Sequence, residues 1–427
     1  MIQFLPKVFC SLIDKEGKFN LMNAIRMDPL FKLVIILYTI SLPVGMIKIF
    51  HLNRLSSLYI NFLYISMLLL SAIFVYKCLK LKKINLDILS IFLIFIFIYG
   101  LIMGMIMQND LNDVFIDSGR ILFVFLAYLY FFNRRFQEHE LDDFMRYLSI
   151  SLLIVYSLVI AFSYVYAIPK GMIGYFSIAS QRLILPLIYF YKKNPKLSAL
   201  SFVLILFSGK RGVVVSVLIM AGILFVIQLN RFRFRKQFIN IMIGIVILSI
   251  LLLTLIKTGI IDVNILLNRW EYLNPWSEKF DLRIASSGRV EELIGVFTSM
   301  KEDDISYLLG AGNGYSYRFD YIVGSEVFSY ENYRNAHISM INFFMLYGIL
   351  NAIIFYSLIL SNYKKKYLYG LKRKIKVDSL FNISLLVSFG LFVYTFFVYE
   401  LFQEALIWIF LAAVNKQYVE MKKSERK

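Results

Sequence analysis

The chain of 427 residues is 59% hydrophobic, contains 40 Phe and 29 Tyr, and has a formal net charge of +18. A soluble domain of this length could not bury so much apolar surface, so the composition excludes a water-soluble globular protein. The chain has only two cysteines, which excludes a framework of disulfide bonds.

Twelve apolar runs follow one another along the chain. A helix needs about 20 apolar residues to cross a bilayer core. We therefore predict an all-α polytopic membrane protein with about 12 transmembrane helices. A polar leader without a small-residue cleavage site precedes the first run, which we interpret as a retained span. The predicted spans are about 30–50, 55–76, 86–107, 114–132, 144–168, 175–191, 197–209, 212–229, 238–258, 337–361, 379–399 and 401–416.

The runs divide the chain into three parts. About nine spans form an N-terminal bundle over 1–258, a large polar loop covers 259–336, and about three spans with a basic tail occupy 337–427. A loop of this size suggests chemistry or binding at one membrane face. The spans show no convincing internal repeat and no inverted pair of Gly/Pro-broken segments, a pattern found in many secondary transporters.

Lysine and arginine are concentrated in alternate short loops, which is typical of the cytoplasmic side. Both termini are basic as well, so we expect both in the cytoplasm and the large loop outside it. Most of the positive charge then lies beside anionic lipid, and the sequence does not favour a nucleic-acid partner. The basic loops contain Lys77, Lys80, Lys82, Lys83, Arg134, Arg135, Lys192, Lys193, Lys196, Arg231, Arg233, Arg235, Lys236, Lys364 to Lys366 and Lys372 to Lys376.

Four basic residues lie near the predicted outer ends of spans: Arg120, Arg182, Lys210 and Arg211. An ionisable group inside a bilayer is costly, so it usually faces a cavity or a partner. The planar guanidinium group binds phosphate and pyrophosphate in two-point fashion. Together these residues predict a site for an anionic head group. For any one arginine, the alternative is a side chain that extends to the membrane interface.

The loop contains a predicted amphipathic helix that starts near Arg289. Ser287 is a suitable N-cap, and two glutamates in the first turn, Glu291 and Glu292, suit the helix dipole. Arg289 would help to hold an anion at this helix start, or would be an exposed surface residue. Four apolar residues share one face, which we expect to lie on the membrane: Val290, Leu293, Ile294 and Phe297.

A glycine-rich stretch and an aromatic stretch follow this helix. Residues 309–314 lack the preceding strand and the Lys-Ser/Thr of a phosphate loop, so we expect a flexible turn. Tyr315, Tyr317, Phe319 and Tyr321 then alternate, and such rings could stack on sugars or lie at the membrane interface.

Metal ligands are poorly represented in the sequence. The acidic turn 302–304 could bind a hard cation or be solvated, whereas three scattered histidines without a cysteine pair do not form a zinc motif. We therefore predict no metal and no cofactor.

His337 lies where the large loop re-enters the membrane, beside Arg334 and Asn335. A neutral imidazole there could remove a proton from an attacking hydroxyl near pH 7. The alternative is an interfacial histidine that is hydrogen-bonded to the loop. Glu400 and Glu404 lie four residues apart before the last span, either as carboxylates of a site or as a polar cap.

Four short motifs follow one another in the second half of the chain. They are Ser208-Gly209-Lys210-Arg211-Gly212, Gly288-Arg289, Leu309-Gly310-Ala311-Gly312-Asn313-Gly314, and Asn335-Ala336-His337-Ile338 followed by Tyr347-Gly348. Their order resembles that of the O-antigen ligase/polymerase superfamily. The resemblance covers most of the chain by topology and about 205–350 by motif. One departure is Ile338, where the family usually has Asn after the histidine.

The resemblance implies a helical fold similar to C-type glycosyltransferases and a metal-independent, inverting glycosyl transfer. The reaction would take place at the outer face of the bacterial cytoplasmic membrane, from a glycan on undecaprenyl pyrophosphate. It implies catalytic roles for His337, Arg289 and Arg211. The residues implied or predicted to contact the pyrophosphate or glycan are Arg120, Arg182, Lys210, Arg334 and Tyr315.

A Wzy-type polymerase of surface polysaccharide is the member that this sequence resembles most. A chain-length-regulating co-polymerase would then be a further partner. One alternative is a ligase that transfers the polymer to lipid A-core, and another is a polymerase of capsule or exopolysaccharide. A flippase of lipid-linked sugars is an alternative of a different class, and it would need no catalytic histidine.

Overall fold

The structure is a computed structural model of the chain. The predicted span at 238–258 lies outside the residues that it describes, as do Lys210, Ser287 and Gly288, and the side chain of Arg211 is not described either. The described residues are 27–49, 53–81, 83–134, 138–162, 180–208, 211–229, 289–323, 326–334, 336–396, 401–402 and 404–425.

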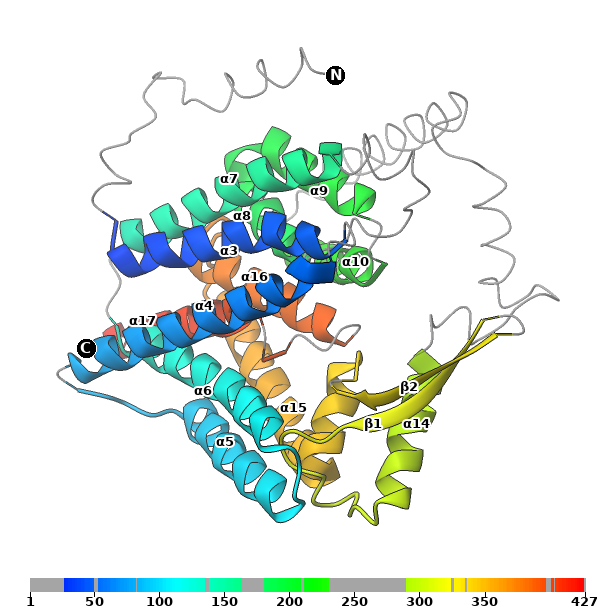
Figure 1. Ribbon diagram of the computed structural model, residues 1–427. Helices are drawn as coiled ribbons and strands as arrows, with labels where there is room; N and C mark the ends of the chain where they lie inside the picture. The colour runs from blue at the N-terminus through cyan, green and yellow to red at the C-terminus, as the bar shows by residue number, and fades with distance from the viewer. Residues whose placement is uncertain are drawn as a thin grey trace.

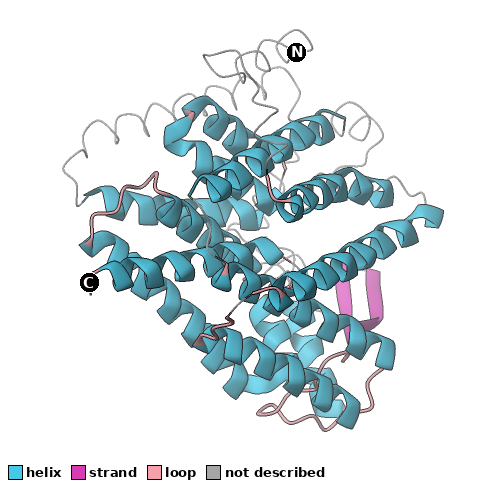
Figure 2. Ribbon diagram, turned by 90° about the vertical axis from the view of Figure 1, so that its left-hand side faces the viewer, coloured by secondary structure: helices cyan, strands magenta, loops and turns pink. Residues whose placement is uncertain are grey.

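Helices make up most of the described chain, and only one small sheet is present in it (Figure 1, Figure 2). The elements are α3 (Pro29–Ile49), α4 (Asn53–Leu79), α5 (Ile88–Ile106), α6 (Leu111–Asn133), α7 (Glu138–Phe162), η3 (Ser180–Leu183), α8 (Ile184–Lys193), α9 (Pro195–Phe207), α10 (Arg211–Leu229), α14 (Arg289–Glu302), β1 (Tyr317–Val323), β2 (Glu326–Tyr333), α15 (Ser339–Lys372), α16 (Leu380–Thr395) and α17 (Ala405–Ser424).

Each predicted span within the described residues coincides with helical structure. Four of the helices are long and apolar enough to cross a membrane: Ile88–Ile106, Leu111–Asn133, His139–Phe162 and Ser339–Lys372. The prediction of a mostly helical chain with membrane-spanning helices is confirmed to that extent. Shorter apolar helices accompany these four, among them α9 and α16.

Helices α8 and α9 differ from the two separate spans predicted there. With 10 and 13 residues, they are about 15 and 20 Å long, whereas a bilayer core is about 30 Å thick. Asn194 ends α8 and caps α9 through a hydrogen bond from the Leu197 amide, and Pro195 stands in the first turn of α9. These residues join the two helices in a tight hairpin, and neither helix, as described, is long enough to cross a bilayer core. Residues 175–179 of the first predicted span lie outside the described residues.

The core of the bundle lies around α17, which packs against α6 and α16. Every residue from Ala405 to Val414 is at most 1% exposed. A helix that is apolar on all sides is expected to be enclosed by other helices, and this segment is. A polar contact holds the same helix: Asn415 donates to the Tyr128 hydroxyl at 2.6 Å, and that hydroxyl donates to Asp87 at 2.5 Å.

Helix α14 and the antiparallel hairpin of β1 and β2 form a separate region that lies beside one end of α15 (Figure 1). The hairpin is a departure from the all-α prediction. Its alternating aromatic residues pair across the strands, with the rings of Phe319 and Tyr330 stacked at 5.0 Å. Helix α14 packs on β1 at Gly295, where a side chain would lie only 2.4 Å from the Arg318 carbonyl oxygen.

The buried face of α14 contains Glu292, Val296 and Met300, whereas Ile294 and Phe297 of the predicted membrane face are 55% and 38% exposed. The helix therefore uses a partly polar face to contact the protein. Its most apolar face is left on the surface.

The glycine-rich stretch is not the flexible turn that the sequence predicted. Gly310, Gly312 and Gly314 are buried and have positive φ angles of 78°, 77° and 81°. The stretch packs against a break in α15 at Gly348, where φ is 80°. Only glycine adopts these backbone angles easily, and the missing side chains let the loop contact α5 and α15 directly.

Candidate functional site

The backbone before α15 holds His337 against Glu292 of α14. The His337 Nδ1 atom lies 2.8 Å from a Glu292 carboxylate oxygen, and the His337 amide donates to the same oxygen at 3.0 Å. Two hydrogen bonds from one residue fix both the backbone and the ring. The large loop and the start of α15 are thereby joined at this histidine.

Glu292 is 2% exposed and is surrounded by donors. The Tyr317 hydroxyl of β1 donates to it at 2.6 Å, and the Arg289 guanidinium lies 3.8 Å from its second oxygen. Burial opposes ionisation, but the hydrogen bonds and charge of His337 and the Tyr317 hydroxyl outweigh it and lower the pKa of Glu292. Burial and the neighbouring carboxylate raise the pKa of Tyr317, so its hydroxyl remains a donor.

This arrangement assigns the two ring nitrogens of His337 different roles. An ionised carboxylate only accepts hydrogen bonds, so Nδ1 carries the proton that Glu292 receives. In the neutral ring, Nε2 then holds the lone pair. Nε2 lies 3.5 Å from the Tyr333 hydroxyl, and the side chain is 25% exposed. Such a ring can accept a proton from a hydroxyl group.

A second group of charges surrounds Asp117 of α6. Arg120 lies 2.9 Å from its Oδ1 atom and Arg334 lies 3.1 Å from the same atom, while the Gly314 amide donates to Oδ2 at 3.1 Å. Arg334 also pairs with Asp113. The structure thus places two of the predicted anion-binding arginines together, and each has a carboxylate partner that the sequence analysis did not assign.

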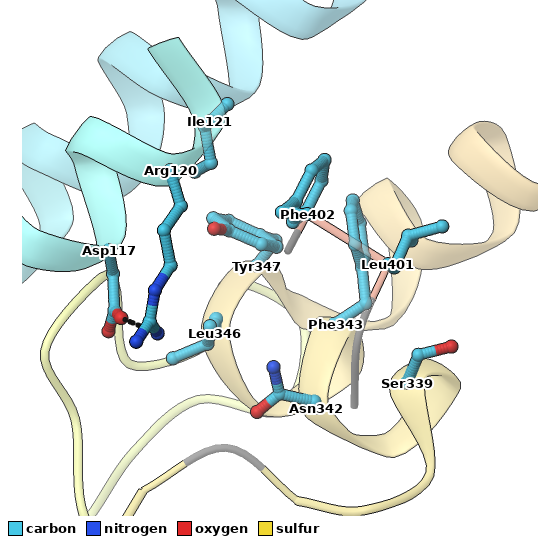
Figure 3. Close-up of a pocket in the computed structure, with 10 residues that line it drawn as sticks. All are labelled: Asp117, Arg120, Ile121, Ser339, Asn342, Phe343, Leu346, Tyr347, Leu401 and Phe402. Atoms are coloured by element: carbon cyan, nitrogen blue, oxygen red, sulfur yellow. Dashed lines mark hydrogen bonds and ion pairs between the residues drawn. The ribbon is translucent and has the colours of Figure 1, made fainter. Parts of the chain in front are cut away.

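A pocket opens beside this group, between α6, the first turns of α15 and the segment before α17 (Figure 3). Polar side chains and aromatic rings both line it, as in many ligand sites. The Ala336 amide donates to Asn342 at 3.0 Å, which connects the His337 segment to the pocket wall. The lining residues are Asp117, Arg120, Ile121, Ser339, Asn342, Phe343, Leu346, Tyr347, Leu401 and Phe402.

Arg182 belongs to a different network, between η3, α3 and α17. It lies 3.2 Å from Glu404 and donates to the Ser41 hydroxyl at 2.7 Å. Glu404 is 2% exposed, so this is a buried ion pair. The sequence left Glu404 either as a carboxylate of a site or as a polar cap at the membrane surface, and its burial excludes the cap. The contacts of Arg182 hold three parts of the bundle together.

Tyr315 does not present its ring for stacking on a sugar. The residue is 6% exposed, and its hydroxyl donates to Asp303 at 2.9 Å. Burial and Asp303 raise the pKa of Tyr315, which keeps the hydroxyl protonated. The predicted glycan contact at this residue is therefore corrected to a buried contact at the C-terminal end of α14.

Sequence reasoning missed Glu292, Asp113 and Asp117 as parts of the site. Glu292 did give a signal: it stands four and eight residues before Val296 and Met300, on the face that becomes buried. A carboxylate at a buried helical position requires a partner. Asp117 gave a local signal too, because it stands three residues before Arg120 on the same helix. The contacts of Asp113 and Asp117 with Arg334 gave none, because more than 200 residues separate them in the sequence.

Within the described ranges, no three His, Cys, Asp or Glu residues are grouped as metal ligands would be. The sequence matches no protein-family model, and no curated protein matches it. The assignment of a function therefore depends on the chemistry of the residues described above.

Proposed function

We propose that this chain is a membrane glycosyltransferase of the O-antigen ligase/polymerase type, and that it polymerises oligosaccharide repeat units carried on undecaprenyl pyrophosphate. The observation that carries the proposal is the pairing of His337 with Glu292 at 2.8 Å, next to arginines and a pocket. A buried carboxylate that orients an imidazole is a common arrangement for general-base catalysis.

In the proposed reaction, an acceptor sugar hydroxyl attacks the anomeric carbon of the lipid-linked glycan. The hydroxyl proton passes to Nε2 of His337 as the new glycosidic bond forms. The bond between the anomeric carbon and the phosphate oxygen breaks, and the electron pair leaves with undecaprenyl pyrophosphate. Attack from the face opposite the leaving group inverts the anomeric configuration.

The leaving pyrophosphate requires positive groups to stabilise its developing charge. Arg289 lies beside the pair formed by His337 and Glu292. Arg120 and Arg334 both contact Asp117. A guanidinium group has five N–H donors, so an arginine that already binds a carboxylate can also bind a phosphate oxygen. Arg211 and Lys210 are included on the basis of the sequence alone, from their predicted place at the outer ends of spans and from the resemblance.

The proposal also assigns an orientation. The basic loops and both termini face the cytoplasm, and α14, the hairpin and His337 lie at the outer face of the cytoplasmic membrane. We further propose a bundle of about twelve membrane segments with a fold similar to C-type glycosyltransferases, in which α8 and α9 form a short hairpin. The undecaprenyl chain would lie among these helices, in contact with lipid.

The test is deletion of the gene, followed by complementation with the wild type, His337→Ala or His337→Gln, and gel analysis of surface polysaccharide. Loss of the long ladder while single repeat units still reach the surface is the expected result for a polymerase. Each variant is checked for insertion by its amount in the membrane fraction. A full ladder with His337→Ala would exclude the general-base role.

The same experiment separates the alternatives. Accumulation of polymer on its lipid carrier, with none attached to lipid A-core, would identify a ligase. Accumulation of single lipid-linked units on the cytoplasmic side would identify a flippase, and restoration by His337→Ala would accompany that result. Loss of capsule or exopolysaccharide with intact O-antigen would assign the same polymerase chemistry to another product.

A further inference from the structure

The non-helical segment from Tyr307 to Gly314 lies alongside the membrane-type helix α5. The Asn313 amide donates to the Gly100 carbonyl oxygen at 2.9 Å, and the Tyr99 hydroxyl donates to the Leu309 carbonyl oxygen at 2.7 Å. Gly100 stands six residues before the end of α5, or about 9 Å along its axis. The segment therefore reaches well below the end of a helix that could cross a membrane.

Every backbone N–H group from Leu308 to Gly314 has a hydrogen-bond acceptor. The amides of Leu308, Leu309 and Gly310 donate to Ser306, the residue just before the segment, at its hydroxyl and its carbonyl oxygen. The next four donate to α15, α5 and α6: Ala311 to Met345, Gly312 to Leu346, Asn313 to Gly100 and Gly314 to the Asp117 carboxylate.

The segment and α15 exchange backbone hydrogen bonds, each donating to the other. At the Gly348 break, the Ile349 amide donates to the Tyr307 carbonyl oxygen at 2.9 Å instead of to the preceding helical turn. The carbonyl oxygens of Met345 and Leu346 accept from the segment at 2.9 and 2.8 Å. Non-helical backbone is tolerated at membrane depth only where protein groups satisfy it, and here the helix and the segment satisfy one another.

The side chains on the outside of this segment are apolar. Tyr307, Leu308 and Leu309 are 41%, 55% and 51% exposed. They continue the exposed apolar faces of α5 and α15, on which Ile102 is 50% and Ile353 is 57% exposed. Helices α5 and α15 are long and apolar enough to span a membrane, so we expect such faces on them to contact lipid.

From these contacts we propose that Tyr307–Gly314 is a re-entrant membrane segment, and that Leu308 and Leu309 lie among lipid acyl chains. On the protein side, the amides of the glycine-rich part donate hydrogen bonds to α15, α5 and α6. On the other side, the two leucines face the hydrocarbon. The exposed face of α14, with Ile294 and Phe297, lies next to this segment. The Phe297 ring contacts the Tyr307 ring, with 5.8 Å between the ring centroids. Lipid is the occupant because this surface is continuous with that of the spanning helices.

The test is the accessibility of nitroxide spin labels in vesicles of phosphatidylethanolamine and phosphatidylglycerol. Single cysteines replace Leu308, Ile353 or Ser329 in a Cys10→Ser background, in which Cys78 is retained because it is only 5% exposed. The unsubstituted background measures any labelling of Cys78. Label at 353 reports the face of α15, and label at the exposed Ser329 of β2 reports the hairpin. Accessibility is measured with molecular oxygen and with Ni–EDDA.

The expected result is a ratio of oxygen to Ni–EDDA accessibility at 308 equal to that at 353 and higher than that at 329. A ratio like that at 329 would place the segment in water and overturn the proposal. Low accessibility to both reagents would mean that protein covers the leucines, and would overturn it as well. Leu309→Cys, at 51% exposure, provides an independent second position should the Leu308 variant fail to fold.

Discussion

Glu292 and His337 are 45 residues apart in the sequence, yet the carboxylate of one lies 2.8 Å from the ring nitrogen of the other. The contact joins the first turn of α14 to the residues before α15, with β1 supplying Tyr317 as a third member. It fixes the ring with Nε2 away from the carboxylate. This geometry makes a positioning role for Glu292 testable separately from the role of His337.

Replacement Glu292→Gln should lower kcat with little change in KM, because the amide no longer selects the tautomer with Nδ1 protonated. Loss of the whole general-base contribution corresponds to about 10²–10⁴-fold, so we expect a loss of about tenfold or more. Turnover of lipid-linked oligosaccharide by the purified protein is the measurement. Glu302→Gln, at the exposed end of α14, is the control and should retain activity. Unchanged kcat in Glu292→Gln would exclude the positioning role.

Acid should loosen the contact between α14 and α15. The pKa of Glu292 is lowered from its ordinary value of 4.5 because His337 and Tyr317 outweigh the effect of burial. A lowered folded-state pKa means that the stabilisation is fully present above pH 4.5 and is lost as the pH falls through the folded value. Melting temperatures between pH 7 and pH 3 should therefore fall more steeply for the wild type than for Glu292→Gln. Parallel curves would contradict this prediction.

Replacement Gly348→Ala should destabilise the protein strongly. The added Cβ would lie 2.0 Å from the Leu308 carbonyl oxygen, at a φ of 80°. Backbone strain alone costs about 1–3 kcal/mol, and displacement of the loop adds to it. Gly222→Ala is the matched control, since nothing lies within 4 Å of its Cβ, and alanine favours a helix by about 1 kcal/mol. Thermal unfolding in detergent should show a large decrease for the first variant and none for the second.

Loss of Arg182 should reduce stability more than catalysis. Removal of one member of a buried ion pair costs about 3–5 kcal/mol, because the other charge is left without its partner. Arg182→Ala and Glu404→Ala should each lower the melting temperature, and the double variant Arg182→Met with Glu404→Met should recover much of it. Recovered stability without recovered activity would indicate instead that Arg182 contacts the substrate, as the sequence suggested.

The helices could be predicted from the sequence because their signals are local. Apolar runs determine where α5, α6 and α15 lie, and Asp87 caps α5 through a hydrogen bond from Ser90. The amphipathic helix at Arg289 was predicted from periodicity and a first turn with two acids, and α14 begins there. The glycine-rich stretch was misjudged, because three glycines look flexible in a sequence, although contacts with neighbouring helices hold them in place here.

By itself, the sequence determined the helical segments and selected His337, Arg289, Arg120 and Arg334 as chemically unusual. Only the tertiary structure decided the distant partners: Glu292 for His337, Asp117 for Arg334, and Glu404 for Arg182. The pairing of Asp117 with Arg120, three residues along α6, is local. The physical reason is the distance along the sequence over which each kind of interaction acts. Hydrogen bonding and hydrophobic periodicity within a helix act over a few residues, whereas a buried charge is compensated by whichever element the fold packs against it.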